Sequence, residues 1–138
     1  MSTSWWLHFL LAVVTGGFAA SMAEWLFSGD LWLPLYRRHP EVWRSSEPNY
    51  SEKTGIAFST AYAFVSAAIF FLLLHLAAIH DWRLSILTAL LMWLMVPLPL
   101  LFTLSYFMKY PRALAVVHAT GWLVKLLLFA LAAIVFRL

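Results

Sequence analysis

Lys125 lies in the middle of an apolar run, HATGWLVKLLLFALAAIVF, that covers residues 118–136. About 20 apolar residues are enough to cross the ~30 Å hydrocarbon core of a membrane, which places this lysine roughly 18 Å from the start of the span. A charge at that depth costs ~3 kcal/mol or more, so we expect the ammonium group to have a partner. Any chemistry of this chain that needs a charge deep in the membrane therefore involves Lys125.

Two prolines in the preceding apolar run offer such a partner. Pro97 and Pro99 each free the backbone carbonyl four residues earlier, at Trp93 and Met95, nearly at the depth of Lys125. We favour an interaction of the ammonium group with these carbonyls across a helix kink. An anionic ligand or lipid beside the kink is the next alternative, and snorkelling of the side chain to the interface is the last.

Glu24 carries the opposite charge, but a vertical gap of ~13 Å leaves it barely within reach of Lys125. At its own depth, roughly 5 Å inside the first span, lie polar side chains of the other spans, His118, Tyr62 and Thr103. We predict a polar cluster of these four residues. A hydrogen-bonded pair of His118 and Glu24 would respond to pH and bind a proton or a cation, or else serve as a structural interhelical bond.

His8 and His75 lie at matching depth near the other end of the first two spans, as a haem or a pigment would require. Both are placed by helical phase away from the polar face of their helices, at about 100° per residue. We interpret them as interfacial histidines and predict no cofactor.

The first loop, residues 28–55, is the only sizeable segment outside the apolar runs. It interleaves aromatic and basic residues, which suit the headgroup layer of a membrane. We expect one or two short interfacial helices there, which either anchor the protein or bind a partner or an anionic lipid. The residues concerned are Trp32, Tyr36, Arg37, Arg38, Trp43 and Arg44.

The four apolar runs, at residues 5–27, 56–79, 86–107 and 113–136, must position these side chains. Each is predicted to be a helix, because backbone groups in lipid have to be satisfied within their own segment. With 64% hydrophobic and 11% charged residues, the chain has too few polar residues to cover a soluble domain. We predict an all-α polytopic membrane protein, an up-and-down four-helix bundle forming one transmembrane domain over residues 1–138. The second, third and fourth helices are expected to be neighbours.

The distribution of Lys and Arg indicates the orientation. Six of these residues lie on the side of the first and third loops and two on the other side. By the positive-inside rule, both loops are predicted to be cytoplasmic and both termini outside, in a bacterial inner membrane.

Several classes of function find no support in the sequence. It contains no HExxH, no GxSxG and no glycine-rich phosphate loop, so no catalytic residue is predicted. The absence of cysteine excludes disulfides and thiolate metal sites, and we predict no metal site. The net charge of +3 comes from residues beside the membrane, so we expect no nucleic-acid partner.

Glycine, tryptophan and proline recur along nearly the whole chain, at Gly17, Trp25, Trp43, Pro97, Pro99, Gly121 and Trp122. With the four spans, this layout resembles a family of small four-span bacterial membrane proteins catalogued as a domain of unknown function. The resemblance implies the fold and no activity. In that family an acidic residue often precedes the glycine–aromatic pair, whereas here the nearest ionisable residue before the pair is His118.

Three functions remain open. The leading hypothesis is a non-catalytic binding or accessory protein that acts through membrane lipids or protein partners, as a homo-oligomer or within a larger membrane complex. The first alternative is a small oligomeric transporter, or an ion- or small-molecule-binding protein, that uses Glu24, His118 and Lys125. The second is a membrane enzyme with His118 and Glu24 as acid and base, which would need a water-accessible pocket.

Overall fold

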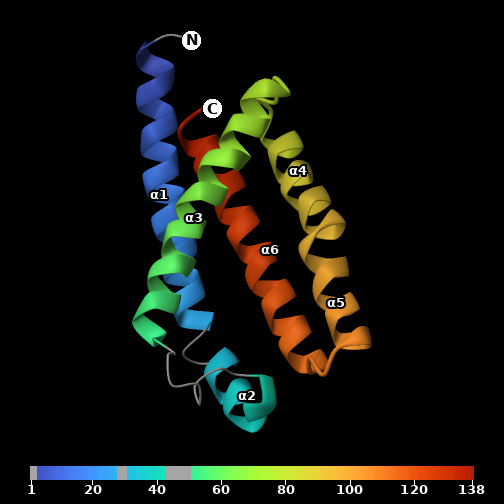
Figure 1. Cartoon of the computed structure of the whole chain (residues 1–138). Coiled ribbons are helices and arrows are strands. Elements are labelled where there is room, and N and C mark those ends of the chain that lie inside the picture. The colour runs from blue at the N-terminus through green and yellow to red at the C-terminus, as the bar shows by residue number, and fades with distance from the viewer. Residues whose placement is uncertain (1–2, 28–30, 43–50) are drawn as a thin grey trace.

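The computed structural model describes residues 3–27, 31–42 and 51–138, and the elements in these ranges are helical (Figure 1). In chain order they are α1 (Thr3–Phe27), α2 (Leu33–Arg38), the short 3-10 helix η2 (Pro40–Val42), α3 (Glu52–Leu76), α4 (Trp82–Met95), α5 (Pro97–Phe107) and α6 (Arg112–Val135).

Four stretches are long and apolar enough to cross a membrane: Ser4–Phe27, Glu52–Leu76, Trp82–Phe107 and Arg112–Val135. Their mean hydropathy lies between 1.6 and 2.2, and each agrees with a predicted span to within a few residues. The all-α, four-span prediction is therefore confirmed, and the protein is a multi-pass membrane protein. Both termini lie at the same end of the bundle, opposite to α2 (Figure 1).

The two internal spans begin at side-chain caps. Ser51 Oγ accepts a bond of 3.3 Å from the backbone N–H of Thr54, so α3 starts four residues before the predicted span. Asp81 Oδ1 accepts from the N–H groups of Arg83 and Leu84 at 2.9 and 3.1 Å and starts α4. These bonds satisfy N–H groups that have no partner within a helix.

The third span is interrupted at Val96, between α4 and α5, next to the first of the two prolines at which a kink is expected. Val96 has φ −120° and ψ −70°, outside the helical region, and Pro97 follows it. The break arises because proline has no N–H to donate and its ring crowds the preceding turn. Pro97 is buried, whereas Pro99 is exposed.

α6 is the central helix of the bundle. It packs against α1 on one side and against α4 and α5 on the other, while α3 packs mainly on α1 (Figure 1). The expectation that the second and third spans are neighbours is therefore wrong along most of their length. Their short connection fixes only the adjoining ends, and each helix then follows the partner that buries its small or aromatic residues.

Small residues allow close contact between the helices. Gly17 of α1 lies directly under the ring of Phe64 in α3, and Gly16 lies near the rings of Phe71 and Phe129. The rings of Phe70, Phe71 and Phe129 pack together with centroids 6.0 to 6.2 Å apart. This aromatic cluster joins α1, α3 and α6 in the half of the bundle away from α2.

Candidate functional site

Lys125 forms an ion pair with Glu24. The distance from Lys125 Nζ to Glu24 Oε2 is 2.7 Å, and the two side chains are only 10% and 17% exposed. The prediction that Glu24 is barely within reach, and the preference for the carbonyls of Trp93 and Met95, are therefore wrong. α1 and α6 are instead joined by opposite charges within the spans.

The direction of the side chains explains why this pair forms across the estimated gap. In a helix each Cα–Cβ bond leans toward the N-terminus of that helix. α1 and α6 run in opposite directions, so Glu24 leans away from the α2 end while Lys125 leans toward it (Figure 1). The two long side chains lean toward each other, so their charged atoms are much closer than the depths of the two backbone positions indicate.

An aromatic ring adds to the surroundings of the ammonium group. Lys125 Nζ lies 4.8 Å from the centroid of the Trp122 ring on the same helix. Such a cation–π contact contributes ~2 kcal/mol when the cation is removed from water. The charge of Lys125 therefore has two partners within the chain, the carboxylate of Glu24 and the indole of Trp122.

His118 contacts Trp32, the N-cap residue of α2, and Tyr36 of α2, rather than Glu24. Its Nε2 lies 3.0 Å from the hydroxyl of Tyr36, and its ring stacks on the indole of Trp32 with centroids 4.2 Å apart. The predicted hydrogen bond between His118 and Glu24 is therefore wrong. The reason is that α2 and its N-cap residue pack against the start of α6, where Tyr36 and Trp32 occupy the His118 ring.

Gly121 makes room for this docking. A Cβ atom at Gly121 would lie 3.1 Å from Cζ2 of Trp32, tighter than an ordinary contact. Trp32 therefore enters a notch on α6 one turn before Lys125. We call residues 31–42 the docked segment, since Trp32 and Tyr36 attach it to α6.

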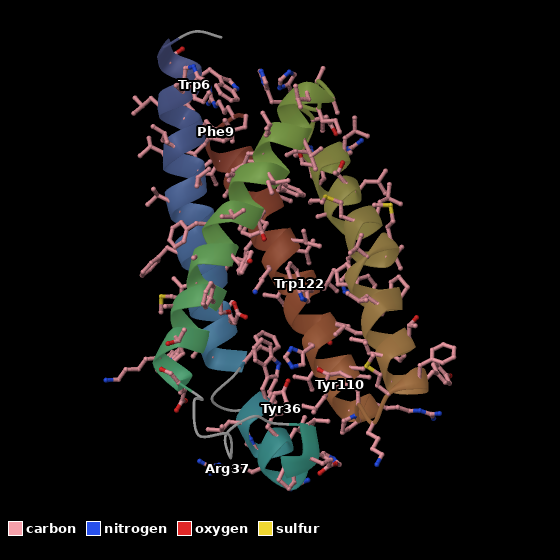
Figure 2. All side chains as sticks on the ribbon, viewed as in Figure 1. Trp6, Phe9, Tyr36, Arg37, Tyr110 and Trp122 are labelled. Atoms are coloured by element: carbon pink, nitrogen blue, oxygen red, sulfur yellow. The ribbon has the colours of Figure 1, made fainter. Side chains whose placement is uncertain are left out.

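Two tyrosines lie between α2 and the first turns of α6 (Figure 2). Burial raises the pKa of Tyr36 above its ordinary value of 10.0, and the nearby Tyr110 hydroxyl offsets this only in part. Burial also raises the pKa of Tyr110, and the charge of an ionised Tyr36 raises it further. Both phenols are therefore kept neutral while the segment is docked.

We predict that docking is unchanged below pH 10 and is lost progressively above it. The undocked phenols ionise at the ordinary pKa of 10.0, whereas the docked phenols stay protonated. The docking free energy is therefore fully present below that pH and falls as the pH rises beyond it. Because the chain has no cysteine, a spin-label pair at Arg38→Cys and Ala113→Cys reports the distance between α2 and α6.

The control is Tyr110→Phe, which keeps the bond between Tyr36 and His118. In this variant the fraction of molecules with the short distance between the labels should fall less steeply with pH, because one of the two ionisable phenols is gone. A label distance that stays constant up to pH 12, or an identical pH profile in the variant, would contradict the prediction.

The remaining predicted cluster residues do not join the site. Tyr62 is 64% exposed on α3, and Thr103 is exposed on α5. The prediction of a four-residue cluster was wrong because polar residues were assumed to face inward. A hydroxyl can face lipid when it bonds to its own helix, as Thr88 Oγ1 does to the Leu84 carbonyl at 2.8 Å.

His8 and His75, near the end of the bundle that carries the termini, have different surroundings. His8 is exposed, whereas the His75 ring lies 4.4 Å from the ring of Trp5, at the contact between α3 and α1. His75 therefore points toward α1 and not outward as predicted. Among the described residues, no group of three or more His, Asp or Glu side chains is arranged to hold a metal ion.

Of the predicted partner-binding loop, Arg37 and Arg38 are exposed, and Trp43 and Arg44 lie outside the described residues. The prediction of one or two short helices in this loop is confirmed by α2 and η2. An interhelical bond of 2.7 Å from Trp93 Nε1 to the carbonyl of Ala119 was not predicted. The sequence signal for this bond was a tryptophan, Trp93, in one span and a small residue, Ala119, in the next, since a small residue leaves its carbonyl accessible.

A protein-family model described as "Protein of unknown function (DUF1761)" matches residues 7–134. This match confirms the resemblance to a family catalogued as a domain of unknown function. Comparisons with curated proteins and with solved structures give no significant match.

Proposed function

The chain belongs to the protein family DUF1761, and we propose from its geometry that it is a non-catalytic accessory membrane protein that binds anionic phospholipid headgroups. The binding surface is the α2 end of the bundle. It comprises the exposed cations of the docked segment and of the connection between α5 and α6.

The observation that carries this proposal is the attachment of the docked segment to α6. Tyr36 bonds to His118 at 3.0 Å, and Trp32 stacks on the same ring and enters the notch at Gly121. Basic loops beside membranes are common and usually reflect topology alone. Here the basic residues follow directly on two anchors, which hold them in a fixed place relative to a transmembrane helix.

The charge at this end is positive. Arg37, Arg38, Lys109 and Arg112 are all exposed. Among the described residues of the docked segment the only carboxylate is that of Glu41, and it pairs with His39 at 3.2 Å. The pKa of the Glu41 carboxyl is lowered first by a hydrogen bond from its own backbone amide, then by His39 and by the charge of Lys109.

The position of these cations suits lipid phosphates. Arg37 and Arg38 follow the end of the first candidate span. Lys109 follows the end of the third and Arg112 begins the fourth, where the headgroup layer begins. Basic residues next to an anionic membrane surface contribute about 1 kcal/mol each. By the positive-inside rule this end faces the cytoplasm, and we assign the protein to the bacterial cytoplasmic membrane in that orientation.

Replacing Arg37 and Arg38 by glutamine is expected to reduce the preference for anionic lipid by roughly fivefold per residue, from ~1 kcal/mol each. The measurement is electron spin resonance of the reconstituted protein with spin-labelled phosphatidylglycerol and phosphatidylcholine. The fraction of motionally restricted label gives the relative association of the two lipids. Raising the salt concentration should weaken the preference of the wild type, because exposed charges are screened.

The matched control is Arg83→Gln, which removes an exposed arginine at the opposite end of the bundle. It should leave the association of the anionic lipid with the α2 end nearly unchanged. An equal loss in this control, or no lipid preference in the wild type at low salt, would mean that the proposal is wrong.

A second candidate is a small transporter or ion-binding protein. The ion pair of Glu24 and Lys125 within the spans favours it, because ionisable residues at such depth often lie on substrate pathways. In that mechanism a proton or a cation competes with Lys125 for Glu24 and loosens the contact of α1 with α6. Uptake by proteoliposomes that depends on Glu24 would support this candidate, and its absence would leave the accessory function alone.

A further inference from the structure

A half-open cavity of about 450 Å³ lies at the end of the bundle that carries both termini. Its polar walls are His80, Asp81, Ser85 and Arg137, and its apolar walls include Ala133 and Ile134. Its volume is within the range of ~300–1,000 Å³ that small-molecule sites occupy. It is formed by the start of α4 and the end of α6.

This cavity lies at the membrane surface. The second candidate span ends at Leu76, the third begins at Trp82, and the fourth ends at Val135. Asp81 and Arg137 therefore lie just beyond the hydrocarbon, while Ala133 and Ile134 lie within it. A ligand that fills the cavity has a polar part next to water and an apolar part next to lipid.

The side chains that line the cavity include one carboxylate, Asp81, and one guanidinium, Arg137, neither of which has an ion-pair partner among the described residues. Asp81 accepts its two backbone bonds through Oδ1, which leaves Oδ2 available to a ligand. Within the described part of the chain, the ion pairs are those of His39 and of Lys125, so neither Asp81 nor Arg137 is paired. Two opposite charges that line one cavity without meeting are suited to a ligand that carries both.

The backbone at Arg137 is unusual. Its φ is +53°, and the N–H of Leu138 bonds to the Ala133 carbonyl at 3.0 Å, which together form the turn that commonly ends a helix at glycine. A residue with a Cβ costs ~1 kcal/mol in this conformation. Ala78 ends α3 in the same conformation, with φ +52°, so this turn needs no arginine and a glycine at 137 would keep it.

We propose that this cavity binds the headgroup of phosphatidylethanolamine. The phosphodiester accepts hydrogen bonds from the guanidinium of Arg137, which suits phosphate oxygens. The ammonium group of ethanolamine donates to the free oxygen of Asp81. The acyl chains continue along the apolar wall into the bilayer. This site is independent of the anionic-lipid surface, since it lies at the other end of the bundle and selects a zwitterion.

The test is native mass spectrometry of the full chain released from nanodiscs that contain equal amounts of phosphatidylethanolamine, phosphatidylcholine and phosphatidylglycerol. We expect phosphatidylethanolamine to be retained over phosphatidylcholine, whose trimethylated ammonium has no N–H to donate. Asp81→Asn and Arg137→Gly should each lower that retention about tenfold, as for the loss of a charged hydrogen bond.

Both variants keep the fold. Asparagine is as good an N-cap as aspartate, so Asp81→Asn keeps the start of α4. Arg137→Gly removes the backbone strain, so its thermal unfolding midpoint should be equal to or above that of the wild type. Loss of lipid together with equal or higher stability is a result that a merely structural role of Arg137 does not produce.

The control variant is Arg83→Gln. Arg83 is a cation at the same end, but its guanidinium lies over the Trp82 ring at 5.2 Å and does not line the cavity. The proposal is overturned if this control loses as much lipid as Arg137→Gly, or if phosphatidylcholine is retained equally well. Retention of soluble glycerophosphoethanolamine as strong as that of the lipid would overturn the lipid assignment in favour of a soluble zwitterion.

Discussion

Replacing Lys125 by methionine should lower the free energy of unfolding by about 3–5 kcal/mol, the usual effect of removing one partner from a buried ion pair. The reason is that Glu24 then keeps a charge within the span with no cation at 2.7 Å to offset it. Glu24→Gln leaves the ammonium group unpaired and should have an effect of similar size. Reversible unfolding in mixed micelles of SDS and a mild detergent measures both.

The double variant, Glu24→Gln with Lys125→Met, separates the pair from its surroundings. Replacing both charges by neutral groups of similar size is often close to neutral for stability, so most of the loss should be recovered. The difference between the double variant and the sum of the singles gives the coupling energy. Lys109→Met, which removes an exposed lysine, serves as the control and should change stability by less than about 0.5 kcal/mol.

These variants also distinguish the two candidate functions. A double variant that is stable and still inserts into membranes, but has lost an ion- or substrate-dependent signal, would assign a transport role to the pair. A Lys125→Met protein with unchanged stability would contradict the structural role, because an unpaired carboxylate at this position could not then be costly.

Replacing Gly17 by alanine is expected to destabilise the protein by about 1–3 kcal/mol, as for an overpacked core. A Cβ atom at this position would overlap the body of the Phe64 ring, with its three nearest atoms at 2.4 to 2.8 Å. The ring is not the end of a flexible chain, so α1 and α3 have to separate. Separation would also loosen the neighbouring contacts of Gly16.

The chain offers a matched control for this change. Gly55 lies in the first turn of α3, and a Cβ atom there would meet nothing within 4 Å. Gly55→Ala should leave stability unchanged or raise it by up to ~1 kcal/mol, since alanine favours a helix more than glycine does. The two alanine substitutions are thus expected to act in opposite directions in the same unfolding assay. Equal effects would show that Gly17 is not a close-contact position.

Hydropathy predicted the four spans, and the prolines indicated a kink in the third, because both features depend on local properties of the sequence. The cost of burying unpaired backbone groups in lipid determines the length of a span. Pro97 interrupts its helix through its own ring and missing N–H, whatever the neighbouring helices are. The same local logic also predicted short helices in the first loop, where Pro34 precedes an aromatic and two arginines.

The partners of the polar residues were less predictable. Depth along each helix axis was a poor guide to Lys125 and Glu24, because side-chain direction and helix direction were not included. Tyr62 and Thr103 were placed inward because they are polar, although both side chains are exposed. A threonine hydroxyl can face lipid when it bonds its own helix. The docking of Trp32 on His118 depends on how the chain folds back after α1, and no periodic pattern describes such a loop.

The central position of α6 has a consequence for biogenesis. α6 is synthesised after the other three spans. α1 and α3 can therefore pair first, whereas α4 and α5 pack on their main partner only when α6 has been inserted. Lys125 enters the membrane when Glu24 is already there. The carboxylate of Glu24 can therefore pair with Lys125 during the insertion of α6. This order of synthesis lowers the free-energy cost of inserting a helix that carries a charge into lipid.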